Sequence, residues 1–246
     1  MHVTADGLRL ATYVARPPGS GRVPAVVLCH GFPTGARGAA TSARTYPELA
    51  DRIAREAGWL AAALNFRGTG ESEGDFSIDG WRADLSAAVD ALAARDDVRG
   101  IWTVGVAEGG TIAVCQAAGD DRVHGVATLA APRSLAEWTR DPGRLLAHAR
   151  RIGMIRDPSF PSDRPAWERQ LASLDAVAAA RVLAPRPLLV IHGIDDDVVD
   201  VSDARALADA AGDHAELRVV HAAGHRLRHD PRAVAMLLGW LERHAP

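Results

Sequence analysis

The chain has 246 residues, of which 48% are hydrophobic and 24% are charged, and its formal net charge is −3 at pH 7. A chain of this length and composition buries a sizeable core as one globular domain. The slightly acidic charge argues against nucleic acid as a partner, because nucleic acids bind basic surfaces. Its two cysteines exclude a disulfide-rich scaffold and a four-cysteine zinc site. We see no signal peptide and no apolar run of about 20 residues, so we expect a cytoplasmic protein with no membrane partner.

Short apolar runs alternate with amphipathic stretches along the chain, and this alternation predicts an α/β fold with a mostly parallel central sheet flanked by helices. Residues 3–16 and 23–29 predict strands around a turn rich in proline and glycine. The next predicted elements are, in chain order, helix 42–57, strand 59–66, helix 79–96, strand 101–106, helix 110–118, strand 123–131, strand 187–192, helix 202–211, strand 216–221 and helix 231–244.

Residues 133–183 interrupt this alternation. The segment is rich in proline and holds three large aromatic residues, Trp138, Phe160 and Trp167. We interpret it as a helical lid inserted within a single domain that spans residues 1–246. The three aromatic side chains are candidates to line an apolar substrate pocket, and packing within the lid is the alternative.

Four short motifs follow predicted strands: HGFP at 30–33, GVAEGG at 105–110, HGIDDDV at 192–198 and AGHR at 223–226. In these motifs and their order the chain resembles the α/β-hydrolase superfamily, in particular dienelactone-hydrolase-like and serine-peptidase-like esterases. The resemblance covers essentially the whole chain. It implies the α/β-hydrolase fold and the cleavage of a small ester or amide through an acyl-enzyme.

The resemblance also assigns roles to individual residues. Position 107 is that of the nucleophile, Asp196 that of the acid and His225 that of the general base. The backbone N–H groups of Phe32 and Glu108 would form the oxyanion hole. Among the neighbouring aspartates, Asp195, Asp197 and Asp200 remain alternatives for the acid.

The chain departs from the superfamily at the nucleophile, where the pattern G-x-S-x-G becomes G-x-A-x-G. Ala107 has no group that attacks a carbonyl carbon, and neither neighbour replaces it. The elbow holds its central residue in a strained conformation, often with positive φ, which costs an alanine about 1 kcal/mol. A turn kept only for its shape would favour glycine, so we interpret the segment as a catalytic elbow without its hydroxyl group. Either the serine was replaced by design or the natural protein lacks it.

Three functional hypotheses follow. The first is an ester or amide hydrolase that is inactive in this form, because loss of the nucleophile removes about 10⁶-fold of the rate. The second is a natural member without a nucleophile, in which His225 and Asp196 act as a general-base dyad of a lyase, isomerase or cofactor-free oxygenase. The third is a pseudo-hydrolase that binds a ligand without transforming it.

Two further patterns carry less weight. The literal motif G-x-S-x-G occurs at residues 70–74, but the strand and helix that an elbow requires do not flank Ser72, and a glycine-rich surface loop is the better interpretation. His221, His225 and His229 have helical spacing, but Gly224 predicts a loop between them. We therefore expect no metal and no cofactor, and a small-molecule substrate as partner.

Overall fold

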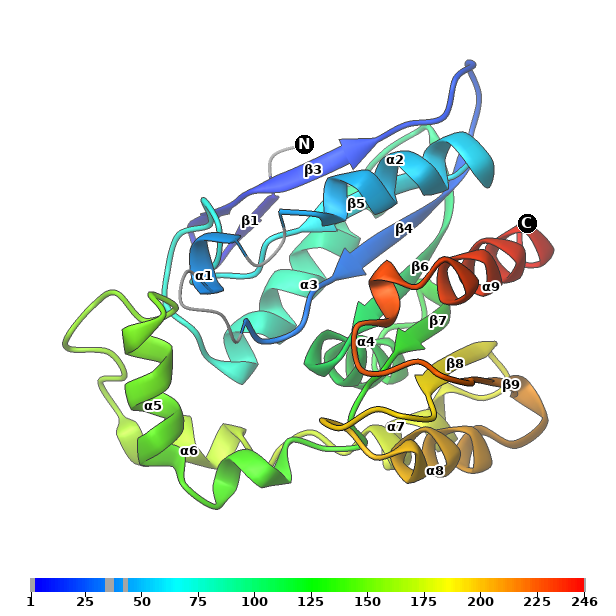
Figure 1. Cartoon of the computed structure of the whole chain (residues 1–246). Helices are drawn as coiled ribbons and strands as arrows, with labels where there is room; N and C mark the ends of the chain where they lie inside the picture. The colour runs from blue at the N-terminus through cyan, green and yellow to red at the C-terminus, as the bar shows by residue number, and fades with distance from the viewer. Residues whose placement is uncertain (1–2, 34–37, 42–43, 246) are drawn as a thin grey trace.

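The computed structural model describes residues 3–33, 38–41 and 44–245. A seven-stranded sheet crosses the molecule in the order β3-β5-β4-β6-β7-β8-β9 (Figure 1). Its neighbouring strands are parallel except for β3, which pairs antiparallel with β5. The strands are β3 (Thr12–Ala15), β4 (Val23–Cys29), β5 (Leu60–Leu64), β6 (Val98–Val106), β7 (Val123–Leu129), β8 (Leu188–Gly193) and β9 (Ala215–Val220). The predicted α/β fold is confirmed, and β1 (Val3–Ala5) and β2 (Leu8–Leu10) form a separate hairpin.

Helices cover both faces of the sheet (Figure 1). One hydrophobic core lies against α3 (Ile78–Ala93), α4 (Glu108–Ala118), α7 (Ala176–Leu183) and α8 (Val201–Ala211). A second core, on the opposite face, lies against α2 (Tyr46–Glu56) and α9 (Pro231–Arg243). The remaining short helices are α1 (Gly38–Thr41), η1 (Ala136–Thr139), α5 (Pro142–Arg151), α6 (Arg164–Gln170), η2 (Gly212–His214) and η3 (Leu227–His229).

The unbroken apolar character of the central strands follows from these two cores. Strand β4 alternates between them, since Val27 packs in the first core while Val26 and Leu28 pack in the second. Parallel strands that are covered on both faces have no polar side, which is why their sequences do not alternate. The four motifs predicted to form the site lie at the carboxyl ends of β4, β6, β8 and β9.

The segment 133–183 contains η1, α5, α6 and α7. Its last helix, α7, packs against α4 and α8 and so belongs to the layer that covers the sheet. In Figure 1, α5 and α6 extend to one side of the sheet. Trp167 anchors this extension, because its side chain is buried and its Nε1–H donates a hydrogen bond to the Phe76 carbonyl at 3.0 Å.

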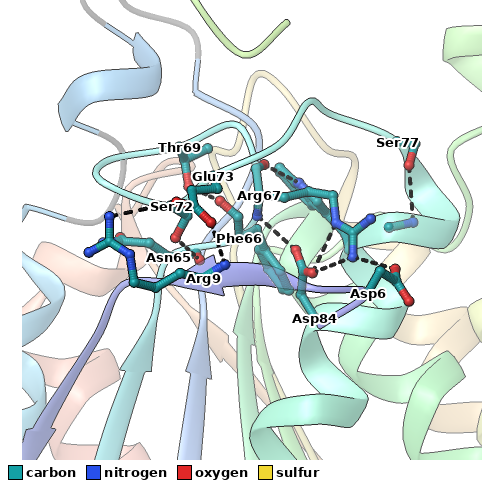
Figure 2. Close-up of polar contacts among 12 residues, drawn as sticks. Asp6, Arg9, Asn65, Phe66, Arg67, Thr69, Ser72, Glu73, Ser77 and Asp84 are labelled. Atoms are coloured by element: carbon teal, nitrogen blue, oxygen red, sulfur yellow. Dashed lines mark hydrogen bonds and ion pairs between the residues drawn. The ribbon is translucent and has the colours of Figure 1, made fainter. Parts of the chain in front are cut away.

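A buried ion pair supports the loop that follows β5 (Figure 2). The Arg67 guanidinium donates to Asp84 Oδ1 from Nε at 2.9 Å and from Nη2 at 2.7 Å. Asp84 Oδ2 also accepts the backbone N–H of Arg67 at 2.7 Å, and Asp6 binds the same guanidinium at 2.8 Å. The Asp84 side chain is fully buried, so this pair ties α3 to the loop with no competition from water.

No helix in the described ranges has both the length and the apolar content required to cross a membrane.

Candidate active site

Ala107 lies between β6 and α4 with φ 49° and ψ −127°, which confirms the predicted positive φ at the elbow. The Ala107 N–H continues the sheet by donating to the Leu129 carbonyl of β7 at 2.9 Å, and the turn is closed by the Gly110 N–H, which donates to the Ala107 carbonyl at 2.8 Å. Both flanking positions, 105 and 109, require glycine because backbone atoms lie too close for a side chain. A Cβ on Gly105 would lie 2.3 Å from the Gly109 carbonyl oxygen, and a Cβ on Gly109 would lie 2.4 Å from the His30 carbonyl oxygen. The sequence thus builds the full geometry of an elbow around a methyl group.

His225 and Asp196 lie together although they are far apart in sequence. His225 Nδ1 is 3.0 Å and 3.2 Å from the two carboxylate oxygens of Asp196. The Asp196 side chain is fully buried, and its Oδ1 accepts the N–H groups of Val198 and Val199, each at 2.9 Å. These bonds fix the carboxylate, which holds the His225 ring through Nδ1 and leaves Nε2 outside this contact. Asp200 has a different task, because it caps α8 by accepting the Ser202 N–H at 2.7 Å.

Four of the predicted residues line one cavity of about 1120 Å³. Ala107, Glu108, Phe32 and His225 all line it. Its remaining wall includes Tyr46 and residues from the loop that follows His225. The structure therefore brings the HGFP, GVAEGG and AGHR motifs around a single space large enough for a small organic molecule.

The Glu108 side chain lies at the Phe32 N–H, the donor that was predicted to bind a substrate oxygen. Its Oε2 accepts the backbone N–H of Phe32 at 2.8 Å, and its carboxyl group also interacts with the N–H of Glu108 itself. Burial raises the pKa of Glu108 above its ordinary value, and these N–H groups and His225 oppose the shift. The superfamily motif predicts a role only for the backbone N–H of Glu108. An acidic residue directly after the elbow was the available signal for this contact.

His30 braces the loop that carries Phe32. Its ring is buried, and its Nδ1–H donates to the Gly31 carbonyl at 2.8 Å while Nε2 accepts the Phe66 N–H at 3.1 Å. The ring also packs edge-on against Phe66 and Trp81, with ring centroids 5.1 Å and 5.4 Å away. These contacts need a neutral imidazole, and burial lowers the pKa of His30 to about 4.

We expect acid to destabilise the fold through His30. The pKa of an unperturbed histidine is 6.5, and that of His30 in the folded chain is about 4. Between these two pH values the unfolded chain binds a proton at His30 that the folded chain does not bind. The free energy of unfolding should fall by about 3 kcal/mol more than in a His30→Asn variant over this interval. Urea unfolding at pH 7 and pH 4 measures this difference. Exposed His214 provides the matched control, because His214→Asn should leave the acid dependence intact; an equal acid dependence in His30→Asn would contradict the role of burial.

Two residues that line the site were missed by the sequence analysis. The Arg228 guanidinium lies 4.6 Å from the centre of the buried Tyr46 ring and donates a hydrogen bond to Thr45 Oγ1. Burial raises the pKa of Tyr46, so its hydroxyl group stays protonated. No motif links α2 to the loop after β9, and only the folded chain brings them together.

Ser72 is not part of this cavity. Its side chain is fully buried in the loop after β5 and donates to the Asn65 carbonyl at 2.6 Å (Figure 2). The Ser72 hydroxyl group also accepts the Ala11 N–H at 2.9 Å. These two bonds give Ser72 a structural role. Across the described ranges, no group of three His, Cys, Asp or Glu side chains is arranged to hold a metal ion.

The three predicted lid aromatics also lie elsewhere. Among the residues that the structure describes, Trp138, Phe160 and Trp167 are not part of the wall around Ala107. Trp138 lines a second cavity of about 720 Å³ with residues of η1 and α5. The Trp138 ring contacts Phe32, which lines the first cavity, at a centroid distance of 5.1 Å.

Comparison with known proteins agrees with this architecture. A family model described as X-Pro dipeptidyl-peptidase (S15 family) matches residues 6–183. Proteins from two strains of Mycobacterium tuberculosis, both named only as uncharacterized, are 29% identical over 224 residues, which is 90% of this chain and 70% of each relative.

Solved structures share the fold at low identity. Est1E of Butyrivibrio proteoclasticus with bound ferulic acid has a TM-score of 0.74 at 19% identity, over 99% of this chain and 96% of that one. The meta-cleavage product hydrolase CumD of Pseudomonas fluorescens has a TM-score of 0.69 at 21% identity, over 99% and 97%. GrgF, an α/β hydrolase of a Penicillium species, has a TM-score of 0.75 at 21% identity, over 99% and 97%. The family match covers most of the chain and the fold is that of these hydrolases, so the chain belongs to the S15 family of X-Pro dipeptidyl-peptidases within the α/β-hydrolase superfamily.

Proposed function

We propose that the cavity around Ala107, Asp196 and His225 is the active site of a hydrolase for small esters or amides, in a form that lacks its nucleophile. The elbow carries this proposal. Ala107 keeps a positive φ that glycine would adopt at no cost, and two glycines with no room for a side chain enclose it. Such strain is retained where a side chain must be presented to a substrate.

The paired His225 and Asp196 support the same function. The Asp196 carboxylate holds the imidazole through Nδ1 and leaves Nε2 for the proton of an attacking hydroxyl group. The relatives are compatible with this chemistry, since the family name refers to a peptidase and Est1E was solved with ferulic acid. Without an oxygen at position 107, the chain forms no acyl-enzyme.

A site that uses His225 and Asp196 as a general base without any nucleophile is the second candidate. The intact pair favours it over a pocket that only binds a ligand, because a binding pocket has no need for an oriented imidazole. In either case we assign η1, α5 and α6 to a lid inserted in a single domain. This lid would act on the substrate through Phe32, which contacts Trp138 and His148.

The test is to restore the missing oxygen and measure covalent labelling. We expect Ala107→Ser to gain the mass of a fluorophosphonate probe at position 107, because the paired imidazole activates the new hydroxyl group. The unmodified chain is the matched control and should stay unlabelled although it contains Ser72. Adding His225→Ala should slow labelling about 100-fold or more. An unlabelled Ala107→Ser protein that is folded would reject the hydrolase assignment.

A further inference from the structure

The carboxyl group of Glu108 occupies the Phe32 N–H, one of the two donors of the predicted oxyanion hole. Oε2 is 2.8 Å from the Phe32 nitrogen, and the Glu108 N–H interacts with the same carboxyl group. Gly31 lies close to the elbow, because a Cβ on it would be 2.8 Å from Ala107 Cβ and 2.9 Å from Glu108 Oε2. A substrate carbonyl oxygen therefore cannot bond to Phe32 N–H while the carboxyl group stays in place.

What a substrate oxygen meets instead is the carboxyl group itself. When Glu108 is protonated, one oxygen accepts the backbone N–H groups and the other presents an O–H donor. The titratable groups around it are His225 from the loop after β9 and Tyr46 from α2, with Arg228 stacked on Tyr46. Burial favours the neutral acid. Buried carboxylic acids of this kind can serve as proton donors to a developing oxyanion.

We propose that Glu108 is a catalytic acid that works with His225, so that water attacks an ester carbonyl directly in the space that a serine oxygen would otherwise fill. This inference rests on the hydrolase function proposed above. The missing hydroxyl group at position 107 and the position of the Glu108 carboxyl group then belong to one mechanism. The Ala107 methyl group leaves room for the water, His225 supplies the base and Glu108 supplies the acid.

The step balances without any further reactant. His225 Nε2 takes a proton from water as the water oxygen bonds to the carbonyl carbon, and Glu108 gives its proton to the carbonyl oxygen. The neutral tetrahedral adduct then returns this proton to Glu108 while the bond to the leaving oxygen breaks. The imidazolium of His225 protonates the leaving alkoxide. One ester and one water give one acid and one alcohol, and both side chains are restored.

The experiment compares p-nitrophenyl acetate hydrolysis by the unmodified chain with that of variants at position 108. We expect Glu108→Ala to lower kcat/KM about 100-fold and Glu108→Gln about 10-fold, since the amide donates a hydrogen bond but no proton. Glu242→Gln, which alters an exposed carboxylate of α9, is the matched control and should leave the rate unchanged. Intact mass during turnover should reveal no acetyl-enzyme.

A pH profile separates catalysis from a structural effect. The unmodified chain should give a bell-shaped profile of kcat/KM, and Glu108→Gln should lose the fall at alkaline pH because it cannot lose the proton. The proposal would be overturned if the unmodified chain turned over the ester no faster than His225→Ala. It would also be overturned if kcat/KM of Glu108→Gln still fell at alkaline pH. Faster turnover by Ala107→Ser with Glu108→Ala than by Ala107→Ser alone would overturn it as well, since the carboxyl group would then only obstruct the hole. Labelling of Ala107→Ser tests the hydrolase function separately.

Discussion

Replacing Ala107 by serine is expected to raise kcat/KM for short p-nitrophenyl esters by about 10³-fold. Loss of a triad nucleophile costs about 10⁶-fold in kcat, which sets the upper limit of the gain. The unmodified chain retains general acid catalysis by Glu108 in the water mechanism proposed above, and such catalysis contributes about 10²- to 10⁴-fold. The quotient of these two factors is about 10²- to 10⁴-fold, and the expected gain of about 10³-fold is the centre of this range. Stopped-flow release of p-nitrophenol should show a burst, because the serine form accumulates an acyl-enzyme.

The matched control for this prediction is Ala107→Gly. Glycine relieves the strain of φ 49° and adds no oxygen, so it should stabilise the fold slightly and leave ester turnover unchanged. A serine variant with no gain would mean that its hydroxyl group does not reach His225. A glycine variant as fast as the serine variant would mean that flexibility of the elbow, not its oxygen, limits the rate.

The fold was predictable from the sequence because burial on both faces leaves a plain signature. Strand β4 was predicted with its correct carboxyl end, since Pro24 to Cys29 are apolar without interruption. Residues 133–183 were the harder case, because α7 lies inside this segment, which has no regular alternation. The sequence pattern of α7 predicts an apolar helix face but does not identify the helices that pack against this face, which are α4 and α8.

The site was predictable where a motif fixes the backbone. The elbow at Ala107 and the pairing of Asp196 with His225 follow strand ends, and parallel strands place these ends at one edge of the sheet. The side chain of Glu108 was not predictable in this way. Its position depends on the close approach of Gly31 to the elbow, which is a contact between segments that sequence spacing does not describe.

The second large effect concerns the buried ion pair between Arg67 and Asp84, which supports the loop that follows β5. We expect Asp84→Ala to lower the free energy of unfolding by about 3–5 kcal/mol, because it leaves the Arg67 guanidinium charged and buried with only Asp6 as partner. It also removes the acceptor of the Arg67 N–H. Natural domains are stable by about 5–15 kcal/mol, so this loss is a large part of the total. Urea unfolding at pH 7, followed by far-UV circular dichroism, measures it.

The same helix provides the control for this prediction. Asp90 pairs with Arg122 at 2.6 Å, but the Asp90 side chain is 61% exposed, so Asp90→Ala should cost about 1 kcal/mol or less. Equal losses in the two variants would mean that burial of the pair is not what matters. The loss at Asp84 should also reach the site, because the Phe66 N–H that precedes Arg67 donates to His30, and His30 braces the loop that carries Phe32. In the Ala107→Ser chain, Asp84→Ala should therefore lower ester turnover under conditions where the protein remains folded, whereas Asp90→Ala should not.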